Sequence, residues 1–311
     1  MADLTLLRPV RVAWVGLALA LALLLALAIP RTSEAAKASK GSDEQFYVSL
    51  GDSYAVGYQP GAPGYPGSAT KQGYADVTVK LARKRGYDLE LVNFGCGGET
   101  TTSILERTTE CIVPAIGGPS YEGRTQTDAA VRFLKKQRGE VELITVSIGG
   151  NDVTACASAS EPVGCVVDAV AKISANLAVL VQRLRAAAGR KVLIVGLTYP
   201  DVILGLWVTG GQADQDLARL SVVAFRDFIN PTLKEGYESV SGVFVDVTAA
   251  TGAYGSLDEL TPYPAYGDIP VAVATICRIS WYCDRRDIHL KAEGYKIIAR
   301  LITETLPKKK K

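Results

Sequence analysis

One serine and one histidine carry the main chemistry that this sequence offers. Gly51-Asp52-Ser53 directly follows an apolar run at residues 46–50, and His289 is the only histidine of the 311-residue chain. A serine hydroxyl is a weak nucleophile until an adjacent base takes its proton, and histidine is the side chain that titrates near neutrality. Any serine–histidine mechanism must therefore use His289. Taken alone, each residue also has a purely structural interpretation, Ser53 as the cap of a Gly-Asp turn and His289 as a loop residue before a last helix.

Two glycine- and asparagine-containing motifs also stand at the ends of apolar runs. Asn93-x-Gly95-x-x-Gly98 lies at the end of a run at residues 89–93, and Gly149-Gly150-Asn151-Asp152 follows a run at residues 141–148. Gly98 would let a backbone N–H approach a developing oxyanion, and Asn151 would add a side-chain donor to the N–H of Ser53. These three residues form a candidate oxyanion hole. The alternative is two glycine turns, one with a self-capping asparagine.

In chain order, Ser53, Gly98, Asn151 and His289 resemble the four blocks for which the SGNH, or GDSL, hydrolases are named. The resemblance covers nearly all of the chain after its N-terminal segment, and the six-cysteine layout is similar to that of secreted actinobacterial lipases and esterases. It implies a three-layer α/β/α fold, a serine nucleophile and an oxyanion hole from Ser53, Gly98 and Asn151. It also implies hydrolysis of carboxylic esters with no metal or organic cofactor. Tyr54 stands where the GDSL name has leucine.

The residue that would orient His289 departs from the family pattern. The family's last block reads Asp-x-x-His, and Arg286 occupies the aspartate position. Arginine cannot accept the Nδ1 hydrogen, which must be held to fix the tautomer of the ring. Asp287, two residues before the histidine, Asp284, five before, and a backbone carbonyl are the available acceptors. We expect Asp287 to take this role.

Five short apolar runs alternate with amphipathic segments along the chain. Short, nearly continuous runs suit strands that are covered on both faces, so the alternation predicts an α/β fold with a parallel sheet. Together with the resemblance, it predicts a three-layer α/β/α sandwich with a flavodoxin-like, five-stranded sheet. The strands are expected at residues 46–50, 89–93, 141–148, 192–197 and 243–247, and helices at about residues 74–85, 127–138, 163–188, 213–229 and 292–306.

Three stretches rich in Gly, Pro, Thr or Tyr are predicted as long loops, at residues 59–73, 95–124 and 249–287. The third stretch carries five aromatic side chains that either wall an acyl pocket or pack the loop onto the sheet. They are Tyr254, Tyr263, Tyr266, Trp281 and Tyr282.

The six cysteines predict disulfides rather than a metal site. No Cys-x-x-Cys pair occurs, and one histidine does not suffice for the usual mixed Cys/His sites, so we expect no metal. Six cysteines allow fifteen connectivities, among which the sequence alone does not choose. Pairing between chain neighbours is expected. It joins Cys96 with Cys111, Cys156 with Cys165, and Cys277 with Cys283.

The N-terminus predicts export from the cytoplasm. Arg8 and Arg11 precede an uncharged apolar run at residues 12–30, which small and polar residues follow. Residues 1–38 therefore form a signal peptide, cleaved after Ala35 or Ala38, or a signal anchor, because the run is long enough to span a bilayer. In either case the hydrolase domain, residues 39–307, lies outside the cytoplasm, secreted or tethered to the membrane. Residues 308–311 form a basic tail, expected to be solvated.

The composition excludes several classes of protein. The chain is 48% hydrophobic and 21% charged, and 34 basic residues face 32 acidic ones, so neither disorder nor nucleic-acid binding is indicated. After the N-terminal segment about 270 residues remain, enough for one large domain. We expect a monomer that acts on a small-molecule or lipid ester. The alternatives are a carbohydrate O-acetylesterase with a shallower, more polar pocket, and a non-catalytic binding module on the same scaffold.

Overall fold

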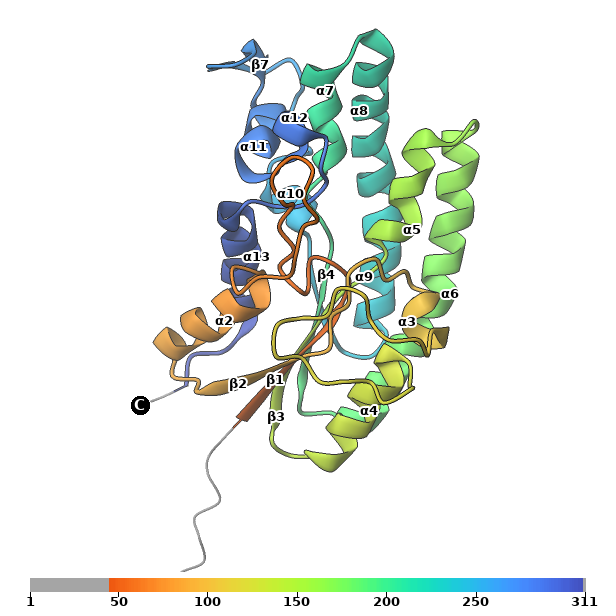
Figure 1. Cartoon of the computed structure of the whole chain (residues 1–311), viewed down its shortest axis with the longest axis vertical. Helices are drawn as coiled ribbons and strands as arrows, with labels where there is room; N and C mark the ends of the chain where they lie inside the picture. Colours follow the sequence, from red (N-terminus) through yellow and green to blue (C-terminus); the bar gives the residue numbers. More distant parts are fainter. Residues whose placement is uncertain (1–44, 310–311) are drawn as a thin grey trace, which may run out of the picture. The chain divides into compact units, whose positions relative to one another are not determined.

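A computed structural model of the chain describes residues 45–309, apart from the side chain of residue 157, so the predicted signal segment lies outside the described residues. The centre of the fold is a five-stranded parallel sheet in the order β2-β1-β3-β4-β5 (Figure 1). This is the flavodoxin-like order, and it confirms the predicted sheet. The strands are β1 (Gln45–Gly51), β2 (Leu89–Asn93), β3 (Val141–Ser147), β4 (Leu193–Leu197) and β5 (Val243–Val245).

Helices cover both faces of the sheet and complete the predicted three-layer α/β/α sandwich. On one face α2 (Tyr74–Ala82) packs against α13 (Ala292–Thr305) (Figure 1). On the other face α6 (Pro162–Ala188) packs against both α4 (Gln126–Lys136) and α9 (Asn230–Glu238). The central strands β1 and β3 are buried along nearly their whole length, which explains why their sequences are continuous apolar runs rather than alternating ones.

The helix predicted at residues 213–229 is longer than expected. It continues to residue 238, because a π-helical turn, η4, links α8 to α9 without a break. Asn230-Pro231 does not end it, because Pro231 stands just after the π-helical turn, where the regular α-helical hydrogen-bond pattern is already interrupted. The bounds of the further helical segments between β3 and α9 are α5 (Gly150–Thr154), η2 (Ala155–Ser158), η3 (Val202–Gly205), α7 (Leu206–Thr209), α8 (Gln212–Ala224) and η4 (Phe225–Ile229).

The prediction of a long loop at residues 249–287 is wrong. An antiparallel hairpin and two helices occupy most of this stretch, and the disulfide between Cys277 and Cys283 joins the two helices. Its density in Gly, Pro and Tyr concealed an apolar helix that buries Val273 and Ile276. The elements are α10 (Val247–Ala250), β6 (Leu260–Tyr263), β7 (Gly267–Pro270), α11 (Val271–Ile279) and α12 (Tyr282–Arg285).

The other two predicted loops are largely irregular, as expected. Residues 59–73 contain one isolated bridge, between Gln59 and Ser68, and residues 95–124 contain the short helix α3 (Ser103–Glu106). The short helical turn η1 (Arg83–Arg85) follows α2. The three disulfides join Cys96–Cys111, Cys156–Cys165 and Cys277–Cys283, which is the neighbour pairing.

The basic tail does not simply project into solvent. The backbone N–H of Lys309 donates to the carbonyl of Arg85 at 3.1 Å, and its ammonium group lies 4.3 Å from the ring centroid of Tyr87. Tyr87 also donates its hydroxyl hydrogen to the carbonyl of Pro307. These contacts correct the expectation of a solvated tail for Lys309, while residues 310–311 lie outside the described residues.

Candidate active site

The Gly-Asp-Ser turn lies at the carboxyl end of β1, where a close backbone approach requires a glycine. A Cβ atom on Gly51, whose φ is +135°, would lie 2.1 Å from the carbonyl oxygen of Ser147. The side-chain amide of Gln126 holds this glycine from both sides, because it accepts from the N–H of Gly51 at 2.7 Å and donates to its carbonyl at 3.0 Å. Ser53 stands two residues after this glycine and is 7% exposed. The fold therefore presents Ser53 at the switch point of the sheet, where α/β proteins bind ligands.

Hydrogen bonds join the ends of three strands at this edge. The N–H of Cys96 donates to the carbonyl of Gly51 at 2.9 Å, which holds the Gly98 loop beside the serine turn. Asn151, at the start of α5, donates its side-chain N–H to the carbonyl of Glu99 at 2.8 Å. The structure thus brings Ser53, Gly98 and Asn151 to one edge of the sheet.

Each of these three residues keeps an N–H hydrogen free. Within residues 45–309, the backbone N–H groups of Ser53 and Gly98 donate to no protein acceptor, and Asn151 uses one of the two hydrogens of its amide. Gly98 has a φ of +82° and is exposed, so no neighbouring side chain covers its loop. Unpaired N–H donors gathered at one edge of the sheet are what the stabilisation of an oxyanion requires.

His289 is paired with Asp287. The carboxylate oxygen Oδ1 of Asp287 lies 2.7 Å from Nδ1 of the His289 ring and also accepts from the His289 backbone N–H at 2.9 Å. Partial burial acts to raise the pKa of Asp287, but the hydrogen bonds and the charge interaction with His289 outweigh it and leave this pKa below its ordinary value. Asp284, the other acidic candidate, instead lies 2.7 Å from the ammonium of Lys291.

A left-handed residue explains why the aspartate stands two places before the histidine. Arg286 ends α12 with a φ of +56°. Its guanidinium donates to the carbonyl of Thr209 and lies 3.7 Å from Asp214, so it takes no part in the histidine pair. The turn at Arg286 leaves Asp287 as the residue whose carboxylate faces the imidazole.

The loop that carries His289 contacts the segment that carries Ser53. The hydroxyl of Tyr54 donates to the carbonyl of Ile288 at 2.7 Å, and the ring of Tyr58 lies 4.3 Å from the His289 ring, centroid to centroid. Ser53 and Ile288 line the same cleft. No hydrogen bond joins the Ser53 hydroxyl to His289 among the described residues, and catalytic hydrogen bonds often tighten only when substrate is bound.

The sequence did not predict the buried residues whose hydrogen bonds hold the serine turn in place. Asp52, interpreted only as part of a turn, accepts from the hydroxyl of Tyr199 at 2.6 Å and from the N–H of Tyr54 at 2.9 Å. Burial raises the pKa of Asp52 to about 7. Tyr199 lies against Gly150, beside Asn151, so this pair links the serine turn to the start of α5. The Gly-Asp-Ser motif was the one available signal, and none indicated Tyr199 or the distant Gln126.

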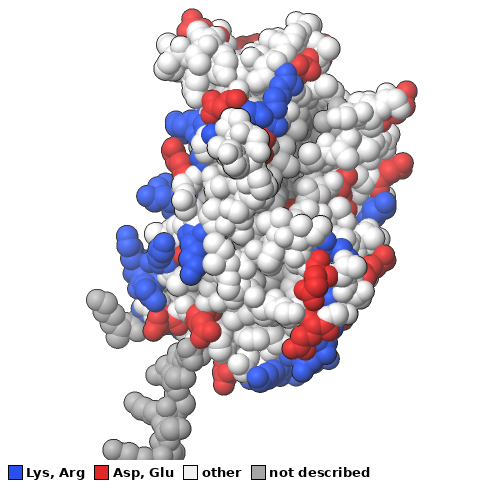
Figure 2. Space-filling model, in the orientation of Figure 1, with Lys and Arg blue, Asp and Glu red and all other residues white. Residues whose placement is uncertain are grey.

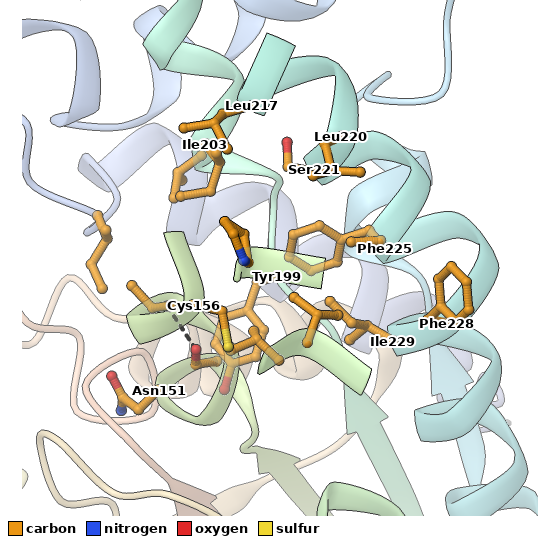
Figure 3. A pocket seen from close by; sticks show the side chains of 18 of the residues that line it. Asn151, Cys156, Tyr199, Ile203, Leu217, Leu220, Ser221, Phe225, Phe228 and Ile229 are labelled. Atoms are coloured by element: carbon orange, nitrogen blue, oxygen red, sulfur yellow. Dashed lines mark hydrogen bonds between the residues drawn. The ribbon is translucent and has the colours of Figure 1, made fainter. Parts of the chain in front are cut away.

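Ser53 and Asn151 line a cleft that opens at this edge of the sheet, and Figure 3 shows side chains of its walls. Its walls are mainly apolar and come from α5, α6, η3, α8 and η4. The five aromatic residues considered for an acyl pocket do not line it, because the segment that holds them folds as a separate hairpin and helix pair. The apolar side chains of the walls include Val163, Val166, Val167, Ile203, Leu217, Leu220, Phe225, Phe228 and Ile229.

The five-stranded parallel sheet, with a Gly-Asp-Ser turn at the end of β1 and a histidine loop before α13, defines the α/β/α class of the SGNH hydrolases. The chain belongs to the GDSL-like lipase/acylhydrolase family, whose model matches residues 49–297. No match to a curated protein sequence was found.

Several solved structures are similar to this chain at low sequence identity. The extracellular lipase of Streptomyces rimosus has a TM-score of 0.50 and 17% identity, over 84% of this chain and 100% of its own. The lipase Lip_vut3 from a goat rumen metagenome has a TM-score of 0.49 and 17% identity, over 84% and 96%. The aryl esterase of M. smegmatis has a TM-score of 0.44 and 14% identity, over 84% and 97%.

Proposed function

We propose that this protein is a secreted carboxylic ester hydrolase that works through an acyl-enzyme on Ser53. The Ser53 oxygen attacks the ester carbonyl carbon while His289 takes the hydroxyl proton, and the same proton is then given to the departing alcohol. Water next attacks the acyl carbon, its proton passes to His289 and returns to Ser53, and the carboxylic acid leaves. Asp287 holds the Nδ1 hydrogen, so that the other ring nitrogen acts as the base.

One observation carries this proposal: the paired His289 and Asp287 lie on the loop that contacts the serine turn, beside three unused N–H hydrogens. A tetrahedral intermediate develops negative charge on the former carbonyl oxygen. The N–H groups of Ser53, Gly98 and the Asn151 side chain supply three donors for it, and loss of one such donor typically costs about 100- to 1000-fold in rate. This assignment requires no metal ligand.

Two features support export. Three disulfides suit an oxidising compartment, and the predicted signal segment at residues 1–38 would direct the chain there. The apolar cleft beside Ser53 favours an acyl ester over an acetylated sugar, because a polar sugar would gain no hydrogen bonds from such walls.

The deciding experiment compares the wild type with Ser53→Ala. We expect the wild type to hydrolyse p-nitrophenyl esters and to react with a fluorophosphonate probe, and the variant to do neither while it keeps its circular dichroism spectrum. Full hydrolysis by the variant would remove Ser53 from the mechanism. A wild type that the probe does not label would indicate a binding module, and hydrolysis of acetylated sugars alone would indicate a carbohydrate O-acetylesterase.

A further inference from the structure

Exposed apolar side chains gather at the mouth of the cleft. Of the twelve large apolar side chains that the described residues expose, five line this one cleft. We call these five the cleft rim. Two come from the first turns of α6 and three from α8 and η4, and both groups line the same cleft; Figure 3 labels Leu220 and Phe228 of the second group. They are Val163 (60% exposed), Val167 (51%), Leu220 (37%), Val223 (37%) and Phe228 (47%).

The helix α6 is more apolar than its packing requires. By length and composition it could cross a membrane, yet only 17% of the residues in its most apolar 18-residue window are buried. Its later turns belong to the core, where Ile173, Leu177 and Leu184 are buried. Its first turns leave valines in solvent, and the disulfide between Cys156 and Cys165 holds them next to η2. An apolar surface of this kind marks an interaction site rather than a core.

The charge pattern indicates what covers this surface. Among the side chains that line the cleft, the one that can carry a charge is Asp52, which is buried beside Ser53. Figure 2 shows that uncharged atoms form much of the hollow between the helical walls, with basic and acidic side chains at its upper left. The apolar lining itself is complementary to a neutral acyl chain and offers no ion-pair partner to a charged peptide or polysaccharide inside the cleft.

Because the rim is continuous with the cleft, the kind of ligand that covers the rim can be specified further. The rim and Ser53 line a single cavity, so what covers the rim stands at the entrance to the nucleophile. The acyl chain of a lipid matches both parts, because it is apolar along its length and ends in an ester carbonyl. A second copy of this chain would cover the rim but would close the path to Ser53.

We propose that the cleft rim rests on the surface of a neutral lipid aggregate, from which the cleft takes one long acyl chain to Ser53. The substrate class is therefore a long-chain ester presented in an aggregate. The acyl chain then passes from lipid to protein without exposure to water, which avoids the free-energy cost of hydrating its apolar surface. The hydrolytic part of this inference rests on the proposed function, whereas docking on lipid does not.

The test combines vesicle binding with hydrolysis. Phosphatidylcholine vesicles that carry trioleoylglycerol are floated with the full chain, and fatty acid release is measured beside the hydrolysis of dissolved p-nitrophenyl acetate. The rim variant carries Val163→Ser, Val167→Ser and Phe228→Ser. A matched control removes three apolar side chains that do not line the cleft and are at least 48% exposed, by Ile112→Ser (87% exposed), Val179→Ser (48%) and Leu260→Ser (57%).

We expect the rim variant to lose at least about tenfold in vesicle binding, because three apolar side chains no longer enter the lipid interface. Its hydrolysis of trioleoylglycerol should fall by a similar factor relative to its hydrolysis of p-nitrophenyl acetate, and the control should behave as the wild type. The Ser53→Ala variant should still bind vesicles, so a failure of the catalytic proposal is distinguishable from a failure of docking.

Three results would overturn the inference. The wild type could fail to float with the vesicles, or the rim variant and the control variant could bind them equally. Light scattering could also show a wild-type dimer that the rim substitutions dissociate, and the face would then be covered by a second copy of the chain. Circular dichroism and fluorophosphonate labelling of the rim variant establish that any loss of vesicle binding does not come from unfolding.

Discussion

The geometry of the Asp287–His289 pair predicts that Asp287→Asn lowers kcat/KM far less than Asp287→Ala does. One oxygen of Asp287 accepts both the backbone N–H of His289, at 2.9 Å, and its Nδ1 hydrogen, at 2.7 Å. In the asparagine variant the amide oxygen must keep this place, since a flipped amide would point N–H hydrogens at two donors. The tautomer of the ring is therefore retained, and the variant loses only the negative charge.

The magnitudes follow from the type of hydrogen bond lost. A bond to a charged group contributes about 1.5–3 kcal/mol and a neutral bond about 0.5–1.5 kcal/mol. The side chains of His289 and Asp287 are 14% and 27% exposed, so solvent partly screens the charge and the lower end of the difference, about 1 kcal/mol, applies. Loss of about 1 kcal/mol corresponds to about a fivefold fall in kcat/KM. Asp287→Ala also frees the tautomer, and we expect a fall of roughly 1000-fold.

The assay is kcat/KM on p-nitrophenyl butyrate, with Asp284→Asn as the matched control. Asp284 pairs with Lys291 rather than with the imidazole, so this variant should stay close to the wild type. Equal losses in the asparagine and alanine variants of Asp287 would refute the argument on amide orientation. A loss in Asp284→Asn as deep as that in Asp287→Ala would refute the choice of Asp287 as the orienting group.

Two further predictions concern stability. Burial raises the pKa of Asp201 to about 7 from an ordinary value of 3.8, so the folded protein holds a proton there that the unfolded chain releases. The free energy of unfolding should therefore fall as the pH rises from about 4 to 7. Urea titrations at pH 5 and pH 8 measure this fall, and in Asp201→Asn it should be smaller by about 1–4 kcal/mol. A fall as steep in the variant as in the wild type would contradict the raised pKa of Asp201. Gly51→Ala places a Cβ 2.1 Å from the Ser147 carbonyl oxygen at a φ of +135° and should cost about 3 kcal/mol or more. The control Gly64→Ala, at a φ of +86° in open space, should cost about 1–2 kcal/mol from backbone strain alone, and similar losses in thermal unfolding would argue against the close approach.

The success of the predicted sheet and helices has a local cause. Parallel strands are buried on both faces, so each appears in the sequence as a short apolar run, and helices on the sheet repeat their apolar residues every three or four positions. The segment at residues 249–287 broke these patterns. Its hairpin is short and largely exposed, and α11 spans only nine residues, a length at which an apolar run does not distinguish a helix from a strand.

The sequence by itself determined which groups are available for chemistry and the strand ends at which they lie. It contains one histidine, one Gly-Asp-Ser turn after a strand, and Gly98 and Asn151 after the next two predicted strands, all properties of neighbouring residues. The sequence did not decide whether Asp287, Asp284 or a backbone carbonyl accepts the Nδ1 hydrogen of the imidazole. That choice depended on the left-handed turn at Arg286, which no pattern in the sequence signals.

Only the tertiary structure decided what surrounds the nucleophile. Gln126 reaches Gly51 across 75 positions of the chain, and Tyr199 reaches Asp52 across 147. The cleft and its rim likewise depend on how α6 stands opposite α8 and η4. Such contacts are set by the packing of whole helices on the sheet, so they depend on the shape of the folded core and not on the spacing of residues along the chain.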